Sequence, residues 1–179
     1  MNEDIDFLRF PLGKFTAPDI ISPNQIEIWI STLEKFPAEV ERVTATLSES
    51  QLDTPYRPGG WTIRQVVHHL PDSHMNAYIR FKLAITEEHP VIRPYREERW
   101  AECEEARSAP VDISLSLLKS LHNRWTVFLR TLTDENFNRT YIHPENSKTF
   151  SLKEVLGMYV WHGNHHLAHI TETVRRNKW

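Results

Sequence analysis

Cysteine is almost absent from this chain of 179 residues, and glycine is scarce. The single cysteine, Cys103, excludes an intrachain disulfide framework and a zinc site built from cysteines. Acidic residues flank Cys103, and such surroundings disfavour a thiolate, so this side chain is a poor candidate nucleophile. The five glycines form no glycine-rich phosphate loop, so the sequence carries no nucleotide-binding signature.

Positive charge is lacking as well, because 21 lysine and arginine residues against 24 acidic residues leave a formal net charge of −3. This balance excludes the strongly basic surface with which proteins neutralise nucleic-acid phosphates. No apolar run reaches the roughly 18 residues that a membrane span needs, and the acidic residues 1–6 lack the features of a signal peptide. We therefore expect one cytoplasmic domain over residues 1–179, with no nucleic-acid partner and no membrane partner.

Apolar residues recur at steps of three and four along four stretches, a pattern typical of amphipathic helices. The stretches cover about residues 22–47, 62–86, 112–132 and 151–174. Ser22, which precedes a proline, begins the first helix, and capping boxes begin the second at Thr62 and the fourth at Ser151. Pro37 either kinks the first helix or divides it into two.

The segments between these stretches predict the topology. Residues 1–21 carry prolines and a glycine with little periodicity, which indicates an extended arm. Residues 87–111 form a connection whose length is uncommon unless it is functional or crosses from one end of a bundle to the other. Residues 140–150 predict a small hairpin before the last helix. The sequence thus predicts an all-α fold, a four-helix bundle with a long crossover connection rather than a plain up-down-up-down bundle.

Histidine, in contrast, is abundant, with ten residues in the chain. Four of them lie within eight positions of the last predicted helix: His162, His165, His166 and His169. Two histidines at i and i+4 lie one turn apart on one helix face and can reach the same metal ion. The helix offers two such pairs, His162/His166 and His165/His169, so the spacing indicates a metal site without choosing between them. On an ideal wheel the first pair lies nearer the apolar stripe, which slightly favours it.

A family resemblance leads to a ligand set. Residues 61–70, Trp-Thr-Ile-Arg-Gln-Val-Val-His-His-Leu, resemble the start of the second helix in the DinB/YfiT-like metalloenzyme superfamily, where a tryptophan precedes a ligand histidine by eight positions. Residues 161–170 resemble the His-x-x-x-His of that family's last helix, and segments at residues 56–57, 72–76, 78–82 and 92–95 are similar to its YfiT branch. The resemblance extends from about residue 10 to the end, and it implies a four-helix bundle that is often a homodimer.

The resemblance further implies that His69, His165 and His169 bind one divalent transition metal per chain, zinc or nickel. One departure concerns Pro71, which lacks the N–H of a helical hydrogen bond and is expected to kink the second helix. On the ideal wheel His74 lies on the apolar stripe and His69 lies away from it. The kink would therefore either turn His69 inward or displace it in favour of His74.

Three neutral imidazoles suit zinc, nickel, copper, cobalt or ferrous iron, and they suit magnesium or calcium poorly. Three protein ligands leave one coordination position open, which is the pattern of catalytic rather than structural zinc. Such an ion lowers the pKa of a bound water to about 7 or activates a bound thiolate. The resemblance therefore implies a metal-dependent hydrolase with a small-molecule substrate. One alternative is S-transfer from a low-molecular-weight thiol such as bacillithiol, and another is a non-enzymatic bundle that the metal only stabilises.

No catalytic residue beyond the metal ligands is assigned from the sequence. Residues 72–74, Asp-Ser-His, supply the residue types of a hydrolase triad, but neighbours on a helix do not face one another. Arg80, Lys82 and Arg93 could bind an anionic substrate near the metal, although salt bridges at the surface are the more common role for each of them.

Overall fold

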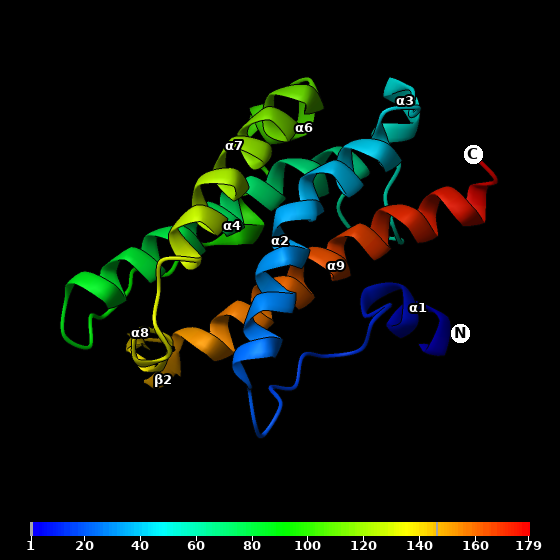
Figure 1. Cartoon of the computed structure of the whole chain (residues 1–179). Coiled ribbons are helices and arrows are strands. Elements are labelled where there is room, and N and C mark those ends of the chain that lie inside the picture. Colours follow the sequence, from blue (N-terminus) through cyan, green and yellow to red (C-terminus); the bar gives the residue numbers. More distant parts are fainter. Residues whose placement is uncertain (1, 146) are drawn as a thin grey trace.

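Four long helices form the body of the molecule in the computed structural model (Figure 1). The structure describes residues 2–145 and 147–179, with side chains from residue 6 onward. The long helices are α2 (Pro23–Thr44), α4 (Ile63–Thr86), α7 (Val111–Leu129) and α9 (Leu152–Asn177). The described residues also form short helices and two strands: α1 (Asn2–Arg9), α3 (Glu49–Leu52), α5 (Glu97–Trp100), α6 (Glu104–Ser108), α8 (Asp134–Asn138), β1 (Thr140–His143) and β2 (Lys148–Ser151).

The helix starts predicted from capping residues are confirmed. The Ser22 hydroxyl accepts a hydrogen bond from the first turn of α2, and Thr62 and Ser151 form complete capping boxes at the starts of α4 and α9. These side chains satisfy amide groups that a helix leaves without partners in its first turn, so each helix begins at its cap. Pro37 does not divide the first helix, because α2 continues through it.

The long helices run up, down, down and up in chain order. Contacts between His68 and Ser114 and between Tyr78 and Phe128 show that α4 and α7 are parallel. Both helices are antiparallel to α2 and α9, and each of α4 and α2 contacts both α7 and α9. Consecutive long helices α2 and α4 therefore occupy opposite corners of the bundle, unlike those of a plain up-down-up-down bundle. The predicted all-α four-helix bundle with a crossover is confirmed.

Residues 87–110 form the crossover, because they return along the bundle from the end of α4 to the start of the parallel helix α7. Side chains of the first turn of α4 hold this segment in place: Gln65 Nε2 donates to the carbonyl of Ala101 over 2.7 Å, and Arg64 donates to the carbonyl of Ala109 over 3.0 Å. The predicted hairpin is also confirmed, with β1 antiparallel to β2 and Thr140 opposite Ser151. The position Asn146, which was expected in the hairpin turn, lies outside the described residues.

The core extends between all four long helices and is built from large apolar side chains. Trp125, Phe81, Leu33, Leu156 and Ile63 are fully or almost fully buried in it. Burying each such side chain contributes roughly 1.5–3 kcal/mol to folding, which is why the apolar stripes decide which helix faces meet. Near the middle of α9, Gly163 allows close packing, since a Cβ there would lie 3.0 Å from the Phe36 ring. This close approach holds the middle of α9 against α2.

The N-terminal arm differs from the expectation of an extended segment over residues 1–21. Asn2–Arg9 form the helix α1, whereas the chain from residue 10 to residue 22 has no helix or strand. A helix this short is marginal on its own and depends on packing, and the carbonyl of Arg9 accepts a hydrogen bond from His169 of α9. No described helix combines the length and the apolar character that a membrane span requires.

Candidate metal centre

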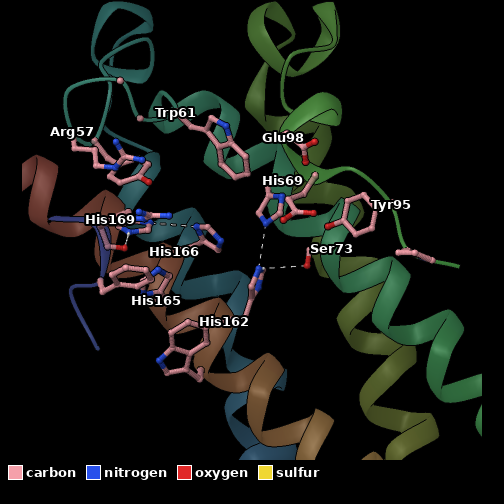
Figure 2. A pocket seen from close by; sticks show the side chains of 18 of the residues that line it. Arg57, Trp61, His69, Ser73, Tyr95, Glu98, His162, His165, His166 and His169 are labelled. Carbon is pink, nitrogen blue, oxygen red and sulfur yellow. Dashed lines mark hydrogen bonds between the residues drawn. The ribbon is translucent and has the colours of Figure 1, made fainter. Parts of the chain in front are cut away.

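Three histidines from two antiparallel helices converge on one point (Figure 2). His69 belongs to α4, and His162 and His166 belong to α9. One ring nitrogen of each lies within 4.8 Å of the others, and Nε2 of His69 lies 3.2 Å from Nε2 of His162. Among the described residues this is the group of three histidine, cysteine or acidic side chains that could hold a metal ion. All three line a cavity with a volume of about 670 Å³.

The local structure of α4 explains the position of His69. The helix continues from Ile63 to Thr86 through the buried Pro71, so the proline does not displace His69 from the cluster. His74, the expected replacement, is fully buried behind the cluster, where it contacts His162 instead of joining the group of three. Trp61, directly before the Thr62 cap, lies with its ring centre 4.8 Å from that of His69.

His165 and His169, which the family resemblance implied as ligands, line the same cavity. The ring of His165 stacks on Trp161 at 4.6 Å and lies near Phe10 of the arm. The ring of His169 stacks on Tyr56 at 4.0 Å. The structure thus brings His69 together with His162 and His166. The ligand set of His69, His165 and His169 stays a prediction.

A chain of hydrogen bonds orients His162. At one end, Nδ1 of His122 lies 2.6 Å from the carbonyl oxygen of Leu33, and a carbonyl can only accept, so this nitrogen carries the proton. In a neutral ring Nε2 of His122 is then an acceptor, and it accepts a hydrogen bond from Nδ1 of His74 over 2.8 Å. Nε2 of His74 in turn accepts from His162 Nδ1 over 3.3 Å. The lone pair of His162 therefore lies on Nε2, the atom that points to His69.

A second, shorter chain does the same for His166. Nε2 of His169 lies 3.2 Å from the carbonyl oxygen of Arg9, so it donates, and Nδ1 of a neutral His169 is an acceptor. Nδ1 of His166 donates to that atom over 3.4 Å, which leaves the lone pair of His166 on Nε2. Partners of this kind fix the tautomer and the ring orientation of metal-binding histidines.

Burial keeps the cluster neutral. Removal from water lowers the pKa of His69 to about 4. The same cause, followed by the charges of neighbouring histidines, lowers the pKa values of His162 and His166 well below the ordinary range. Burial also lowers the pKa values of His122 and His169 to about 4. Neutral imidazoles are the form that binds a metal, so the residues present fit a divalent transition metal.

Polar side chains beside the histidines are additional functional candidates. The Ser73 hydroxyl oxygen lies 3.5 Å from Nε2 of His162, while Tyr95, Glu97 and Glu98 of the crossover line the same cavity. Ser73 was detectable from the sequence as a position four residues after His69 on the same face of α4. The crossover residues carry no periodicity, so only the folded chain shows that they reach the site. Residues 72–74 form no triad, because Ser73 faces His162 and His74 faces the bundle interior.

A sequence profile of the DinB superfamily matches residues 32–170. The chain belongs to the DinB superfamily. Within it, the chain is 52% identical to the Bacillus subtilis protein named "Putative metal-dependent hydrolase YfiT" over 172 residues, 96% of this chain and 97% of that protein. A Bacillus pumilus protein named "Putative metal-dependent hydrolase" is 50% identical over 96% of this chain and 98% of its own length.

Two solved structures are similar to this chain to different degrees. The structure of YfiT from Bacillus subtilis, described as a probable metal-dependent hydrolase with an unusual four-helix bundle topology, has a TM-score of 0.95 and covers 97% of this chain and 99% of its own. A mycothiol-dependent maleylpyruvate isomerase has a TM-score of 0.60 at 16% identity, over 78% of this chain and 60% of its own, and that likeness concerns the fold alone. The chain is thus a relative of proteins named as putative or probable metal-dependent hydrolases, and it carries a candidate site of three histidines.

Proposed function

We propose that this protein hydrolyses a small molecule and that His69, His162 and His166 hold one divalent transition metal, zinc or nickel, for that purpose. The observation that supports this ligand set is the direction of the two hydrogen-bond chains. Each chain ends on a backbone carbonyl, and each leaves a lone pair on the Nε2 atom of a histidine beside His69. In this proposal His169 is a positioning residue for His166, and His165 is a wall of the cavity.

Three protein ligands leave room for a reactant at the metal, as in catalytic rather than structural sites. A bound zinc or nickel ion supplies Lewis-acid chemistry that activates water at neutral pH. The side chains of the protein orient the reactant and enclose the site. The Ser73 hydroxyl, next to His162, is placed to hydrogen-bond a reacting group, and Phe10 and Trp61 limit the access of bulk water.

The test is a substrate screen on protein loaded with one equivalent of zinc or nickel. The screen covers esters, amides and phosphoesters, each with and without a chelator, and a His162→Ala variant serves as the control. We expect hydrolysis of at least one class, and we expect both chelation and the variant to abolish it. Hydrolysis that survives chelation would contradict the proposal.

A parallel assay separates the alternatives. Metal-dependent conjugation of bacillithiol to monochlorobimane, without hydrolysis of any substrate class, would replace the proposal with thiol S-transfer. The non-enzymatic alternative predicts a closed coordination sphere, so azide should leave the visible spectrum of the cobalt-loaded protein unchanged. The proposed site predicts that azide changes this spectrum.

A further inference from the structure

Arg80 is a buried cation without a counter-charge in the wall of the metal cavity. The residue is 8% exposed, and its Nε is enclosed without a hydrogen-bond partner. Its guanidinium lies beside two tyrosine hydroxyls, with Nη1 3.5 Å from the Tyr159 oxygen and Tyr141 as the second neighbour. Within the described part of the chain no carboxylate lies in ion-pair distance of Arg80.

Arg64, on the same helix, shows how this protein otherwise buries a guanidinium. Its side chain is 3% exposed, and it binds the carboxylates of Asp53 and Glu49 together with the carbonyl of Ala109. A guanidinium cannot lose its proton at physiological pH, and a buried charge without a partner is costly. The cavity also contains Glu97 and Glu98, but both are exposed to solvent, and neither pairs with Arg80. Arg80 thus has the properties of a site that an anion from outside the chain completes.

The position of Arg80 relative to the histidines limits the length of a ligand that binds Arg80 through an anionic group and also reaches the histidine cluster. His69, Ser73 and Arg80 lie four and seven residues apart on α4, so they share one face of the helix, and Ser73 and Arg80 are about 10 Å apart along its axis. Tyr159 lies between Arg80 and His162, since its hydroxyl contacts Arg80 and its ring centre lies 5.6 Å from that of His162. A molecule of a few carbon atoms spans this interval.

We propose that Arg80 binds the carboxylate of a small-molecule ligand whose other end reaches the three-histidine centre. The inference rests on the proposed function, because it uses the metal as the second point of attachment. It names the substrate class as small carboxylates, and it assigns binding of the anion to the fork of the guanidinium, which matches the two oxygens of a carboxylate.

Two hydroxamates test this inference by calorimetry on the zinc-loaded protein. Acetohydroxamate has a metal-chelating group alone, and the monohydroxamate of succinic acid has the same chelating group with a carboxylate attached. We expect the carboxylate to tighten binding at least tenfold, the effect of about one charge-assisted hydrogen bond. Equal affinities of the wild-type protein for the two probes would overturn the inference while leaving the metal site intact.

Variants assign the effect to Arg80. Arg80→Gln should bind both probes equally and retain the wild-type affinity for acetohydroxamate, whereas Arg57→Gln, which removes the same charge from the same cavity, should retain the preference for the carboxylate. A preference that survives in Arg80→Gln or disappears in Arg57→Gln would contradict the assignment. If acetohydroxamate itself fails to bind the zinc-loaded wild type, the proposed function fails. The comparison of the two probes on the wild-type protein does not depend on whether a variant folds.

Discussion

The two ring nitrogens of a histidine are not equivalent, and at this site the hydrogen bond on one nitrogen decides what the other can do. His162 and His166 both have Nδ1 committed as a donor, so in both rings the lone pair lies on Nε2 and is free for a metal ion. This explains the role of buried histidines that do not join the cluster, such as His74 and His122. His162 and His166 are thus candidate ligands, whereas His74, His122 and His169 orient them.

The variant His122→Leu tests this separation. His122 is completely buried and is not a candidate ligand, but it begins the chain of hydrogen bonds that ends at His162. Its removal should weaken zinc binding about tenfold, the lower end of the usual effect of outer partners of metal-binding histidines. Competition with a chromophoric chelator measures the affinity.

His68→Leu is the matched control for this variant. His68 of α4 is buried like His122 of α7 and also has two hydrogen bonds, to Ser114 and to the carbonyl of Ala109, but neither bond connects to the cluster. The control should lose stability and keep its zinc affinity. Equal zinc affinities for His122→Leu and the wild type would contradict the idea that the hydrogen bonds from His122 through His74 orient His162.

The histidine motif of α9 indicates a metal site from the sequence alone, but it leaves the choice of ligands open. The four histidines of α9 predicted a metal centre, and the helical wheel slightly favoured the pair His162/His166, which the structure places beside His69. The family resemblance led to His165 and His169 because two overlapping His-x-x-x-His patterns occur three residues apart. Only the packing of α9 against α4 shows which nitrogens meet, since this depends on residues that are far apart in the sequence.

At the scale of elements, the side chain of Arg64 joins α3, α4 and the segment that follows α6. Its three polar contacts reach Glu49, Asp53 and the carbonyl of Ala109, so it holds the crossover near the first turn of α4. The crossover supplies Tyr95 to the wall of the cavity. The contact between Arg64 and the carbonyl of Ala109 therefore helps to hold the segment that supplies this wall.

Arg64→Ala should destabilise the fold by roughly 2 kcal/mol, because charge-assisted hydrogen bonds to a buried guanidinium are lost. Urea denaturation measures the change. Arg42→Ala is the control, since Arg42 forms an exposed pair with Glu39 and should change stability by less than about 0.5 kcal/mol. Similar losses in the two variants would show that Arg64 is no more than another surface ion pair.

The starts of the long helices were predictable because caps and apolar periodicity act locally. The short helices α1, α3, α5, α6 and α8 were not predicted, since elements of this length depend on the surfaces on which they pack. The fold confirmed that residues 87–110 cross the bundle, as their length suggested. The exact order, up, down, down and up, depends on contacts between distant residues that no local pattern records.

At the scale of the whole molecule, the buried histidines couple folding to pH. Burial lowers the pKa of His122 to about 4 in the folded protein, whereas the ordinary value in an unfolded chain is 6.5. Between these values the unfolded chain binds more protons, so the stability is fully present above pH 6.5 and is lost as pH falls toward 4. For His122 alone, the loss at pH 5 amounts to about 2 kcal/mol.

The free energy of unfolding of the metal-free protein should therefore be clearly lower at pH 5 than at pH 7.5, as measured by urea denaturation. The His122→Leu variant should show a shallower dependence on pH, because it lacks one of the groups responsible. A urea concentration at the unfolding midpoint that is the same at both pH values would contradict the burial of neutral histidines.

The homodimer implied by the family resemblance stays a prediction at the same scale. Light scattering coupled to size-exclusion chromatography would show a mass of twice 21.1 kDa for the dimer. A mass of 21.1 kDa at micromolar concentration would contradict it.

The metal content of untagged protein decides between the two histidine pairs of α9 when mass spectrometry is applied to the wild type and to two double variants. We expect about one zinc or nickel ion per chain in the wild type, none in His162→Ala/His166→Ala, and retention of the ion in His165→Ala/His169→Ala. Metal that persists in the first double variant and disappears from the second would refute the proposed ligand set and establish His165 and His169 as the ligands.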